Sequence, residues 1–182
     1  MITLGIAILC VLVFLFESEQ MIANFALVSG LGFSEPWRFI TSMFLHADFA
    51  HLFFNMFALL MFGLYLEKKV GKTMFLLIYL ISGVIGGIGF EIFNGPGVVG
   101  LGASGAIYGI IGALMVLEPN LRVYIYFVPM PIAVAGVFYA LIELVMMGAA
   151  DNIGHAAHLF GLIGGFAIAK LQQKMKGDDL WS

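Results

Sequence analysis

Charged side chains and cysteine are both scarce in this chain. Only 10% of its 182 residues are charged, and Cys10 is the single cysteine. One cysteine excludes a disulfide framework and a cysteine-based metal site, and its apolar neighbours predict packing or lipid contact rather than chemistry. A net charge of −3 gives no basic footprint, so we expect no nucleic acid among its partners.

Apolar sequence takes the place of the missing charge, with 62% hydrophobic residues and a mean hydropathy of +1.07. A soluble core of this length does not need so much apolar area, so the composition indicates a polytopic membrane protein. The sequence contains no repeat or linker, which predicts a single domain over 1–182. Six apolar segments are the expected transmembrane helices, at about 2–16, 49–66, 73–92, 104–118, 132–147 and 153–171.

The basic residues predict an orientation in the membrane. If the six segments alternate, every lysine and arginine except Arg38 falls on one side. By the positive-inside rule both termini and the connections 67–72 and 119–131 are then cytoplasmic, and the loops 17–48, 93–103 and 148–152 face outward. The first segment lacks a basic flank and a cleavage site, so we expect a retained anchor.

The loop 17–48 is too long and too apolar for a simple connection. Trp37 and Arg38 within it suit a membrane interface, because one is amphipathic and the other is able to snorkel. We therefore expect short helices that lie partly in the outer leaflet.

A serine stands among glycines where the fourth segment begins, in GLGASGAIYG at 100–109. That segment ends before Pro119, so it spans about 22 Å of a hydrocarbon core about 30 Å thick. Ser104 is then expected about 8 Å below the outer boundary, at a helix N-terminus inside a cavity. A nucleophile and an ordinary N-cap serine both fit this position.

Histidine reaches a similar depth in the sixth segment, where His158 lies about 7–8 Å from the outer end. Facing glycine stripes let two membrane helices approach closely, which would bring this imidazole to the serine hydroxyl. An intramembrane histidine is a functional candidate, and a satisfied structural histidine is the other reading. The stripes are Gly154, His158, Gly161 and Gly165, and Gly105, Gly109 and Gly112.

A second polar cluster, His46-x4-His51-x3-Asn55, opens the second segment. His51 and Asn55 share a helix face because they are four residues apart. Their N–H groups could face a developing oxyanion beside the Ser104 backbone amide, or hydrogen-bond between helices for packing. Zinc is a third use of histidines, but the chain has no H-E-x-x-H motif and the ligand sets are incomplete, so we expect no metal.

Four motifs together resemble those of the rhomboid intramembrane serine proteases. They follow one another along nearly the whole chain: Trp37-Arg38, His46-x4-His51-x3-Asn55, Gly102-Ala103-Ser104-Gly105 with Tyr108, and Ala157-His158-x2-Gly161. The resemblance implies an all-α polytopic membrane protein, a six-transmembrane-helix bundle with a membrane-embedded L1 loop at 17–48 and a short central fourth helix that carries the serine. It also implies a prokaryotic plasma (inner) membrane, with the active site open to the outer face.

The same resemblance implies a role for each matched residue. Ser104 is expected as the nucleophile and His158 as the general base, in a dyad without a third carboxylate. His51, Asn55 and the Ser104 amide are expected to form an oxyanion hole, with Gly102 in support and Tyr108 stacked on the His158 ring. Structural roles are expected for Trp37, Arg38, His46, Gly105, Gly161 and the pair Gly63 and Glu67.

The implied reaction is hydrolysis of peptide bonds in transmembrane segments of other membrane proteins, with no cofactor. The substrate would enter between the second and fifth segments, where Phe138 and Tyr139 are candidates for a gate. His155 is a competing base, disfavoured because it falls off the glycine stripe. Glu143 is expected to be an interfacial or pore-lining acid rather than a catalytic one. The sequence carries no signal for an oligomeric state.

Two other functions fit part of the pattern. A rhomboid-like protein without protease activity binds transmembrane helices for quality control, but relatives of that kind lack the serine or the histidine. A proton or ion transporter would use the histidines and Glu143, but the sequence lacks the inverted repeats and broken-helix pairs that such folds often have.

Overall fold

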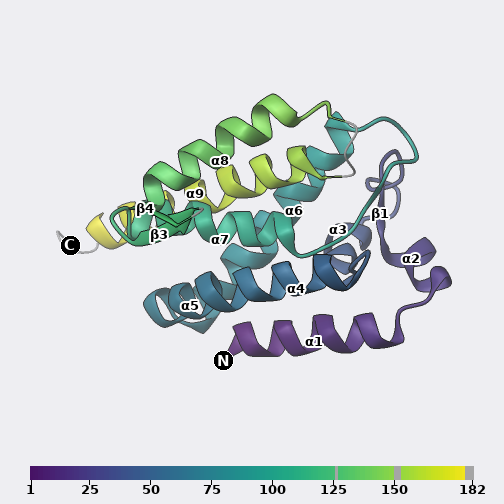
Figure 1. Ribbon diagram of the computed structural model, residues 1–182, viewed down its shortest axis with the longest axis horizontal. Helices are drawn as coiled ribbons and strands as arrows, with labels where there is room; N and C mark the ends of the chain where they lie inside the picture. Colours follow the sequence, from purple (N-terminus) through teal and green to yellow (C-terminus); the bar gives the residue numbers. More distant parts are fainter. Residues whose placement is uncertain (126, 150–152, 179–182) are drawn as a thin grey trace.

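The computed structural model describes residues 1–125, 127–149 and 153–178, with side chains as far as 175. Within these residues, α7 is the central helix of a bundle and packs against α4, α6, α8 and α9 (Figure 1). The long helices are α1 (Ile2–Phe16), α4 (Phe49–Ala58) continued by η2 (Leu59–Gly63) and α5 (Leu64–Val70), α6 (Lys72–Phe93), α7 (Ser104–Leu117), α8 (Ile132–Met146) and α9 (His155–Asp178).

Local signals in the sequence set several of these boundaries. Asp48 caps α4 by accepting a hydrogen bond from the His51 backbone N–H at 2.8 Å. Gly71 separates α5 from α6 with φ of 83°, a conformation that favours glycine. Two predicted ranges end too early. The segment expected at 49–66 continues to Val70 through the π-helical turn η2, and the one expected at 153–171 runs from His155 to Asp178.

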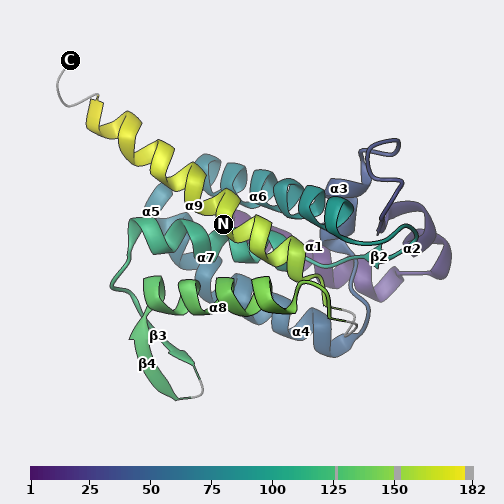
Figure 2. The same cartoon turned by 90° about the horizontal axis from the view of Figure 1, so that it is seen from above.

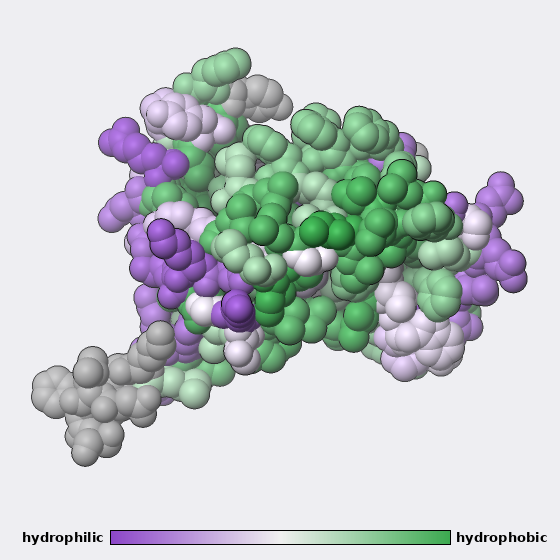
Figure 3. Space-filling view, turned by 90° about the horizontal axis from the view of Figure 1, so that it is seen from below, coloured by the Kyte–Doolittle hydropathy of each residue, from purple (hydrophilic) through white to green (hydrophobic). Residues whose placement is uncertain are grey.

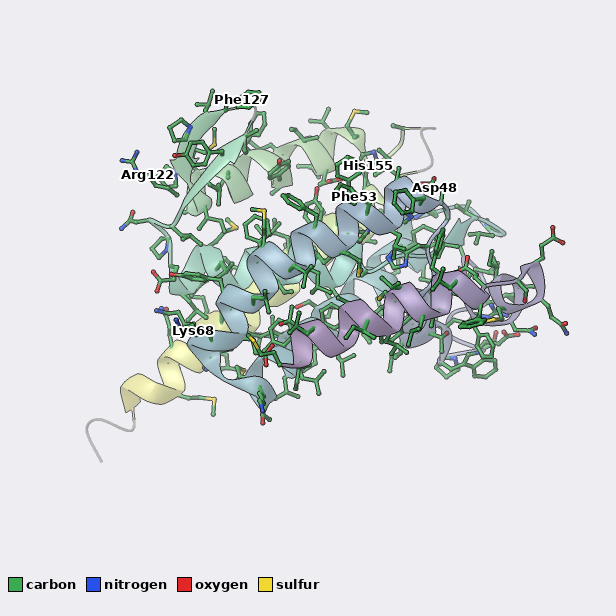
Figure 4. The ribbon with its side chains drawn as sticks, turned by 60° about the horizontal axis from the view of Figure 1, so that its bottom comes forward. Asp48, Phe53, Lys68, Arg122, Phe127 and His155 are labelled. Atoms are coloured by element: carbon green, nitrogen blue, oxygen red, sulfur yellow. The ribbon has the colours of Figure 1, made fainter. Side chains whose placement is uncertain are left out.

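Two helices in the described part of the chain are long and apolar enough to cross a membrane, Phe49–Val70 and Lys72–Phe93. The helices α1, α7 and α8 are apolar but shorter. Hydrophobic side chains form a broad band between hydrophilic groups at the two ends of the molecule (Figure 3). Lys68 and Arg122 lie at one end of the bundle, whereas Asp48 and His155 lie at the other (Figure 4).

The chain is mostly helical, as the expected fold class requires, and two short antiparallel pairs of strands are present in addition. β3 (Arg122–Ile125) and β4 (Val128–Pro131) make a hairpin within the connection 119–131, for which the sequence analysis predicts no secondary structure (Figure 2). The hairpin is rich in β-branched and aromatic residues, which favour strands. β1 (Leu27–Val28) pairs with β2 (Val99–Gly100), so the loop 17–48 is tied to the segment that leads into Ser104.

The loop 17–48 contains short helices, as expected, at α2 (Glu19–Phe25), α3 (Arg38–Thr41) and η1 (Ser42–Phe44). Arg38 does not snorkel, since it is only 5% exposed. Its guanidinium donates to the carbonyls of Ala26 at 2.6 Å and Ala23 at 3.0 Å, and pairs with Glu35 at 2.5 Å. Arg38 therefore holds the fold of the loop from inside.

The pair Gly63 and Glu67 contacts the first residues of α1. The Glu67 carboxylate accepts the backbone N–H groups of Ile2 at 2.8 Å and Thr3 at 2.9 Å, as well as the Thr3 hydroxyl at 2.7 Å. A Cβ at Gly63 would lie 2.9 Å from the Thr3 methyl group. A carboxylate at a helix N-terminus satisfies free N–H groups and opposes the positive end of the helix dipole, so this pair fastens α1 to α5.

The closest approach in the bundle is the seam between α7 and α9. A Cβ at Gly161 would overlap the Gly105 carbonyl oxygen, and one at Gly165 would overlap the Gly109 carbonyl oxygen. On the other side of the seam, a Cβ at Gly112 would overlap the Leu162 carbonyl oxygen. Backbone therefore packs directly on backbone, and this contact fixes the position of the two helices relative to each other.

Alanine substitutions along this seam are expected to separate two kinds of glycine. Gly161→Ala and Gly165→Ala should destabilise the protein by about 1–3 kcal/mol or more, because the obstructing atoms belong to the backbone. Gly164→Ala is the matched control on α9, since the atoms nearest to its Cβ would belong to the Ile85 side chain, at 3.0 Å, and not to the backbone. Thermal unfolding in detergent measures the difference. Equal losses in all three variants would contradict the proposed rigidity of the seam.

Candidate active site

The serine and histidine singled out in the sequence lie side by side. Ser104 is the first residue of α7, and its Oγ lies 2.8 Å from Nε2 of His158 on the first turn of α9. The N-cap residue of α7 is Ala103, so the alternative reading of Ser104 as an N-cap is wrong. A hydroxyl beside an imidazole nitrogen is the pair that general-base activation of serine requires.

Tyr108 lies one turn beyond Ser104 and stacks on the His158 ring. The ring centroids are 4.4 Å apart and the planes differ by 3°. The Tyr108 hydroxyl donates to Oε1 of Glu143 at 2.5 Å. Tyr108 thus restricts rotation of the histidine ring and connects it to α8.

Glu143 lies in the interior of the bundle, which differs from the position expected from the sequence. It was expected at the interface or along a pore, but it is only 4% exposed and lies between α7 and α9. Its Oε1 is 3.1 Å from Nδ1 of His158, and its Oε2 is 2.5 Å from Nδ1 of His155. An acid in an otherwise apolar segment is a functional candidate by default, and this signal was available in the sequence.

His51 lies on α4 with its ring against Gly102. A Cβ at Gly102 would be 2.8 Å from His51 Nε2, and Gly102 has φ of 118°, so both space and conformation favour glycine here. The Ala47 backbone N–H donates to His51 Nδ1 at 3.4 Å. In that tautomer the ring proton is on Nε2, the nitrogen at Gly102.

Asn55 lies one turn further along α4 and is buried. Its Nδ2 donates to the His51 backbone carbonyl at 2.8 Å, and its Oδ1 has no hydrogen-bond partner among the described residues. One N–H of the amide is therefore used within the helix, and the second is available to a ligand.

Two cavities meet at Ser104 and Asn55, which line both of them. One, of about 400 Å³, opens between α4 and α8; its lining is mainly apolar and includes Phe54, Ala58, Ile107, Ala135 and Tyr139. The other, of about 1000 Å³, lies between the loop 17–48, α6 and the start of α9; its polar lining includes Ser42, Asp48, His51, Asn94 and His158. The serine is thus reached from an apolar side and from a polar side. Residues 150–152 of the predicted outward loop 148–152 lie outside the described residues.

His46 does not line either cavity. It is fully buried at the end of the loop 17–48, its ring is 5.3 Å from that of His51, and neither of its ring nitrogens has a hydrogen-bond partner among the described residues. Burial, helped by the proximity of His51, lowers the pKa of His46 to about 4. The structural role expected for His46 is therefore that of a neutral packed ring.

Acid is expected to destabilise the protein through His46. Because the pKa is about 6.5 in the unfolded chain and about 4 in the folded one, the unfolded state binds more protons between these values, and stability falls as the pH drops. The full loss is about 3 kcal/mol. Burial raises the pKa of Glu17, which acts in the opposite direction and reduces the net effect. Melting temperatures at pH 7.5 and 5 should therefore differ more in the wild type than in His46→Leu, and equal differences would contradict the prediction.

Comparison with known proteins gives a family match over most of the chain. A family model described as the Rhomboid domain matches residues 33–174. A putative rhomboid protease YdcA of Bacillus subtilis is 40% identical over 144 residues, which cover 78% of this chain and 70% of the relative. The rhomboid protease GluP of the same bacterium is 38% identical over 138 residues, or 74% of this chain and 26% of the relative. The rhomboid protease GlpG of Haemophilus influenzae is 28% identical over 189 residues, or 98% of this chain and 94% of the relative.

Proposed function

Because the chain belongs to the rhomboid family and is therefore an integral membrane protein, we propose that it is an intramembrane serine endopeptidase with a Ser104–His158 catalytic pair. The observation that carries this proposal is the 2.8 Å distance between Ser104 Oγ and His158 Nε2 beside two cavities. The names of the relatives support this class of reaction. GluP and GlpG are named rhomboid proteases, and YdcA is named a putative rhomboid protease.

In the proposed reaction, Ser104 Oγ attacks the carbonyl carbon of a peptide bond while His158 Nε2 accepts the serine proton. The tetrahedral intermediate then collapses, and His158 gives this proton to the leaving amine nitrogen. Water, activated by the same imidazole, hydrolyses the acyl-serine ester. The cavity lined by His51, Asn94 and His158 is the proposed route for that water.

Charge develops on the carbonyl oxygen during the attack. The donors proposed to stabilise it are His51 Nε2–H, the second N–H of Asn55 and the Ser104 backbone N–H at the start of α7. Each of them lies on a cavity-lining residue at the serine, and fixed donors in a site with little water stabilise an oxyanion strongly.

The substrate is proposed to be a transmembrane segment of another membrane protein. The cavity between α4 and α8 supports lateral entry, because its lining is mainly apolar and it reaches Ser104 from the side of the bundle. Tyr139 lines this cavity, and Phe138 next to it is half exposed. A stable helix hides its carbonyls in hydrogen bonds, so we expect cleavage where small or helix-breaking residues allow local unwinding.

We also propose that all six long helices cross a prokaryotic inner membrane, in one domain, with the loop 17–48 partly embedded. Both termini are then cytoplasmic, and the serine opens to the outer face. The distribution of basic residues supports this orientation, since Lys68 and Arg122 lie at the end of the bundle away from His155 (Figure 4). Lysine accessibility to a membrane-impermeant reagent in sealed vesicles tests it.

Covalent labelling by a fluorophosphonate tests the proposed activity directly. The purified wild-type protein should become labelled at Ser104 and should cleave members of a panel of transmembrane peptides in detergent. The Ser104→Ala variant should show neither labelling nor cleavage. A rhomboid-like helix-binding protein or a transporter has no reason to react at this serine. Absence of both labelling and cleavage in a folded sample would overturn the proposal.

A further inference from the structure

We infer that Glu143 is a positioning residue for His158, which makes the site a Ser104–His158–Glu143 triad rather than a dyad. This inference rests on the proposed protease function and adds a third member to the same site. The carboxylate approaches the histidine from α8, on the ring nitrogen opposite the one that faces Ser104.

The two ring nitrogens of His158 have different partners, Glu143 at Nδ1 and Ser104 at Nε2. Nδ1 lies 3.1 Å from Glu143 Oε1, and a carboxylate accepts hydrogen bonds but donates none. Nδ1 therefore carries the proton in the resting state, and Nε2, which lies 2.8 Å from Ser104 Oγ, is left free to accept. When the serine proton moves to Nε2, the ring becomes a cation beside the Glu143 carboxylate, and no proton needs to pass to the acid.

The carboxylate is itself held in place by two further donors. The Tyr108 hydroxyl lies 2.5 Å from Oε1, and His155 Nδ1 lies 2.5 Å from Oε2. Both partners sit on the helices that carry the reacting residues, since Tyr108 is on α7 and His155 is on α9. Glu143 thus has acceptor geometry fixed on three sides, which a merely interfacial acid would lack. Among the described residues, the titratable groups that face His158 are Glu143, His155, Tyr108 and His51.

A purely structural role is the competing explanation, because Glu143 could simply join α8 to Tyr108 and His155. The two explanations differ at His158. If Glu143 only joins helices, its charge does not affect the protonation of the His158 ring. If it positions the base, the charge and the acceptor oxygen both matter to the chemical step.

The test uses Glu143→Gln, which keeps the volume but removes the charge, and Glu143→Asp, which keeps the charge on a shorter arm. Glu67→Gln is the matched control, since Glu67 is also a buried carboxylate that accepts three hydrogen bonds. Its donors belong to Ile2 and Thr3 at the start of α1, so it does not contact Ser104 or His158. We expect Glu143→Gln to lower kcat and the rate of fluorophosphonate labelling by about 10- to 100-fold without raising KM, because a charge-assisted hydrogen bond is lost. Glu143→Asp should recover part of this loss, and Glu67→Gln should leave kcat within a few-fold of the wild type.

A second measurement does not depend on activity. Nitrogen-15 NMR of histidine-labelled protein in detergent reports which ring nitrogen of His158 carries the proton. We expect protonated Nδ1 and bare Nε2 in the wild type near neutral pH, and a changed tautomer ratio in Glu143→Gln. The inference is overturned if the wild-type ring is protonated on Nε2, or if folded Glu143→Gln keeps the wild-type kcat. If the wild type neither labels nor cleaves, the proposed protease function fails instead, and the NMR result still decides the Glu143–His158 contact.

Discussion

Ser104→Ala and His158→Ala should each abolish cleavage, with a loss of about 10⁴–10⁶-fold in kcat. Without the hydroxyl no acyl intermediate can form, and without the imidazole Ser104 Oγ loses the nitrogen that lies 2.8 Å away to accept its proton. Because the two groups act as a unit, the double variant should be no worse than either single one. Cleavage of a transmembrane peptide in detergent measures the effect.

Matched controls separate chemistry from folding in this experiment. Ser82→Ala removes another buried hydroxyl, one that has no hydrogen-bond partner among the described residues, and His46→Leu removes another buried imidazole. Both should keep activity if folded. Melting temperatures of the Ser104 and His158 variants should stay near that of the wild type. Substantial turnover by Ser104→Ala or by His158→Ala would refute the catalytic pair.

His51→Ala and Asn55→Ala are expected to lower kcat without eliminating activity. Loss of one oxyanion donor costs about 10²–10³-fold in rate, and the loss should be smaller where the remaining donors compensate. The Asn55 side chain also bonds the His51 carbonyl at 2.8 Å, so the two variants should not be additive. The size of the loss should differ between substrates, because each presents its carbonyl differently.

The kinetic signature decides whether these two residues stabilise the transition state. A fall in kcat with little change in KM is expected of an oxyanion donor, whereas a rise in KM with unchanged kcat would mark a binding or structural group. Phe53→Ala is the control on the same helix, because Phe53 is more than half exposed on the outside of α4. This variant should leave kcat unchanged.

The sequence predicts the level of a residue along its helix better than it predicts which face of the helix the residue occupies. The start of α4 at Phe49 and the start of α6 at Lys72 lie close to their predicted places at 49 and 73, whereas α5 continues to Val70, past the predicted end at 66. Counting residues from the helix ends predicted that Ser104 and His158 lie at the same level, and their side chains are 2.8 Å apart. The same counting placed Glu143 near an outer end but did not show that it faces inward.

A face-by-face reading of the fifth segment would have corrected this. The buried residues of α8 are Ile132, Ala135, Gly136 and Glu143, and the last two are seven residues apart, which is two helical turns. Other features could not be predicted locally. The burial of Arg38 and the pairing of β1 with β2 depend on contacts between segments that are distant in the chain.

The burial pattern of α8 has a thermodynamic consequence. Within α8, all of which the structure describes, Glu143 is the sole buried residue beyond the first two turns, so hydrogen bonds to its carboxylate help to hold the C-terminal half of this helix to the bundle, together with the edge-on contact between Tyr139 and Tyr108. A ligand that widens the space between α4 and α8 by moving that half of α8 must do work against those bonds. Linkage is reciprocal, so the free energy that aligns the base is also subtracted from the affinity for any guest that displaces the helix. If the chain is the proposed protease, substrate entry between α4 and α8 and the alignment of His158 for the chemical step oppose each other through Glu143.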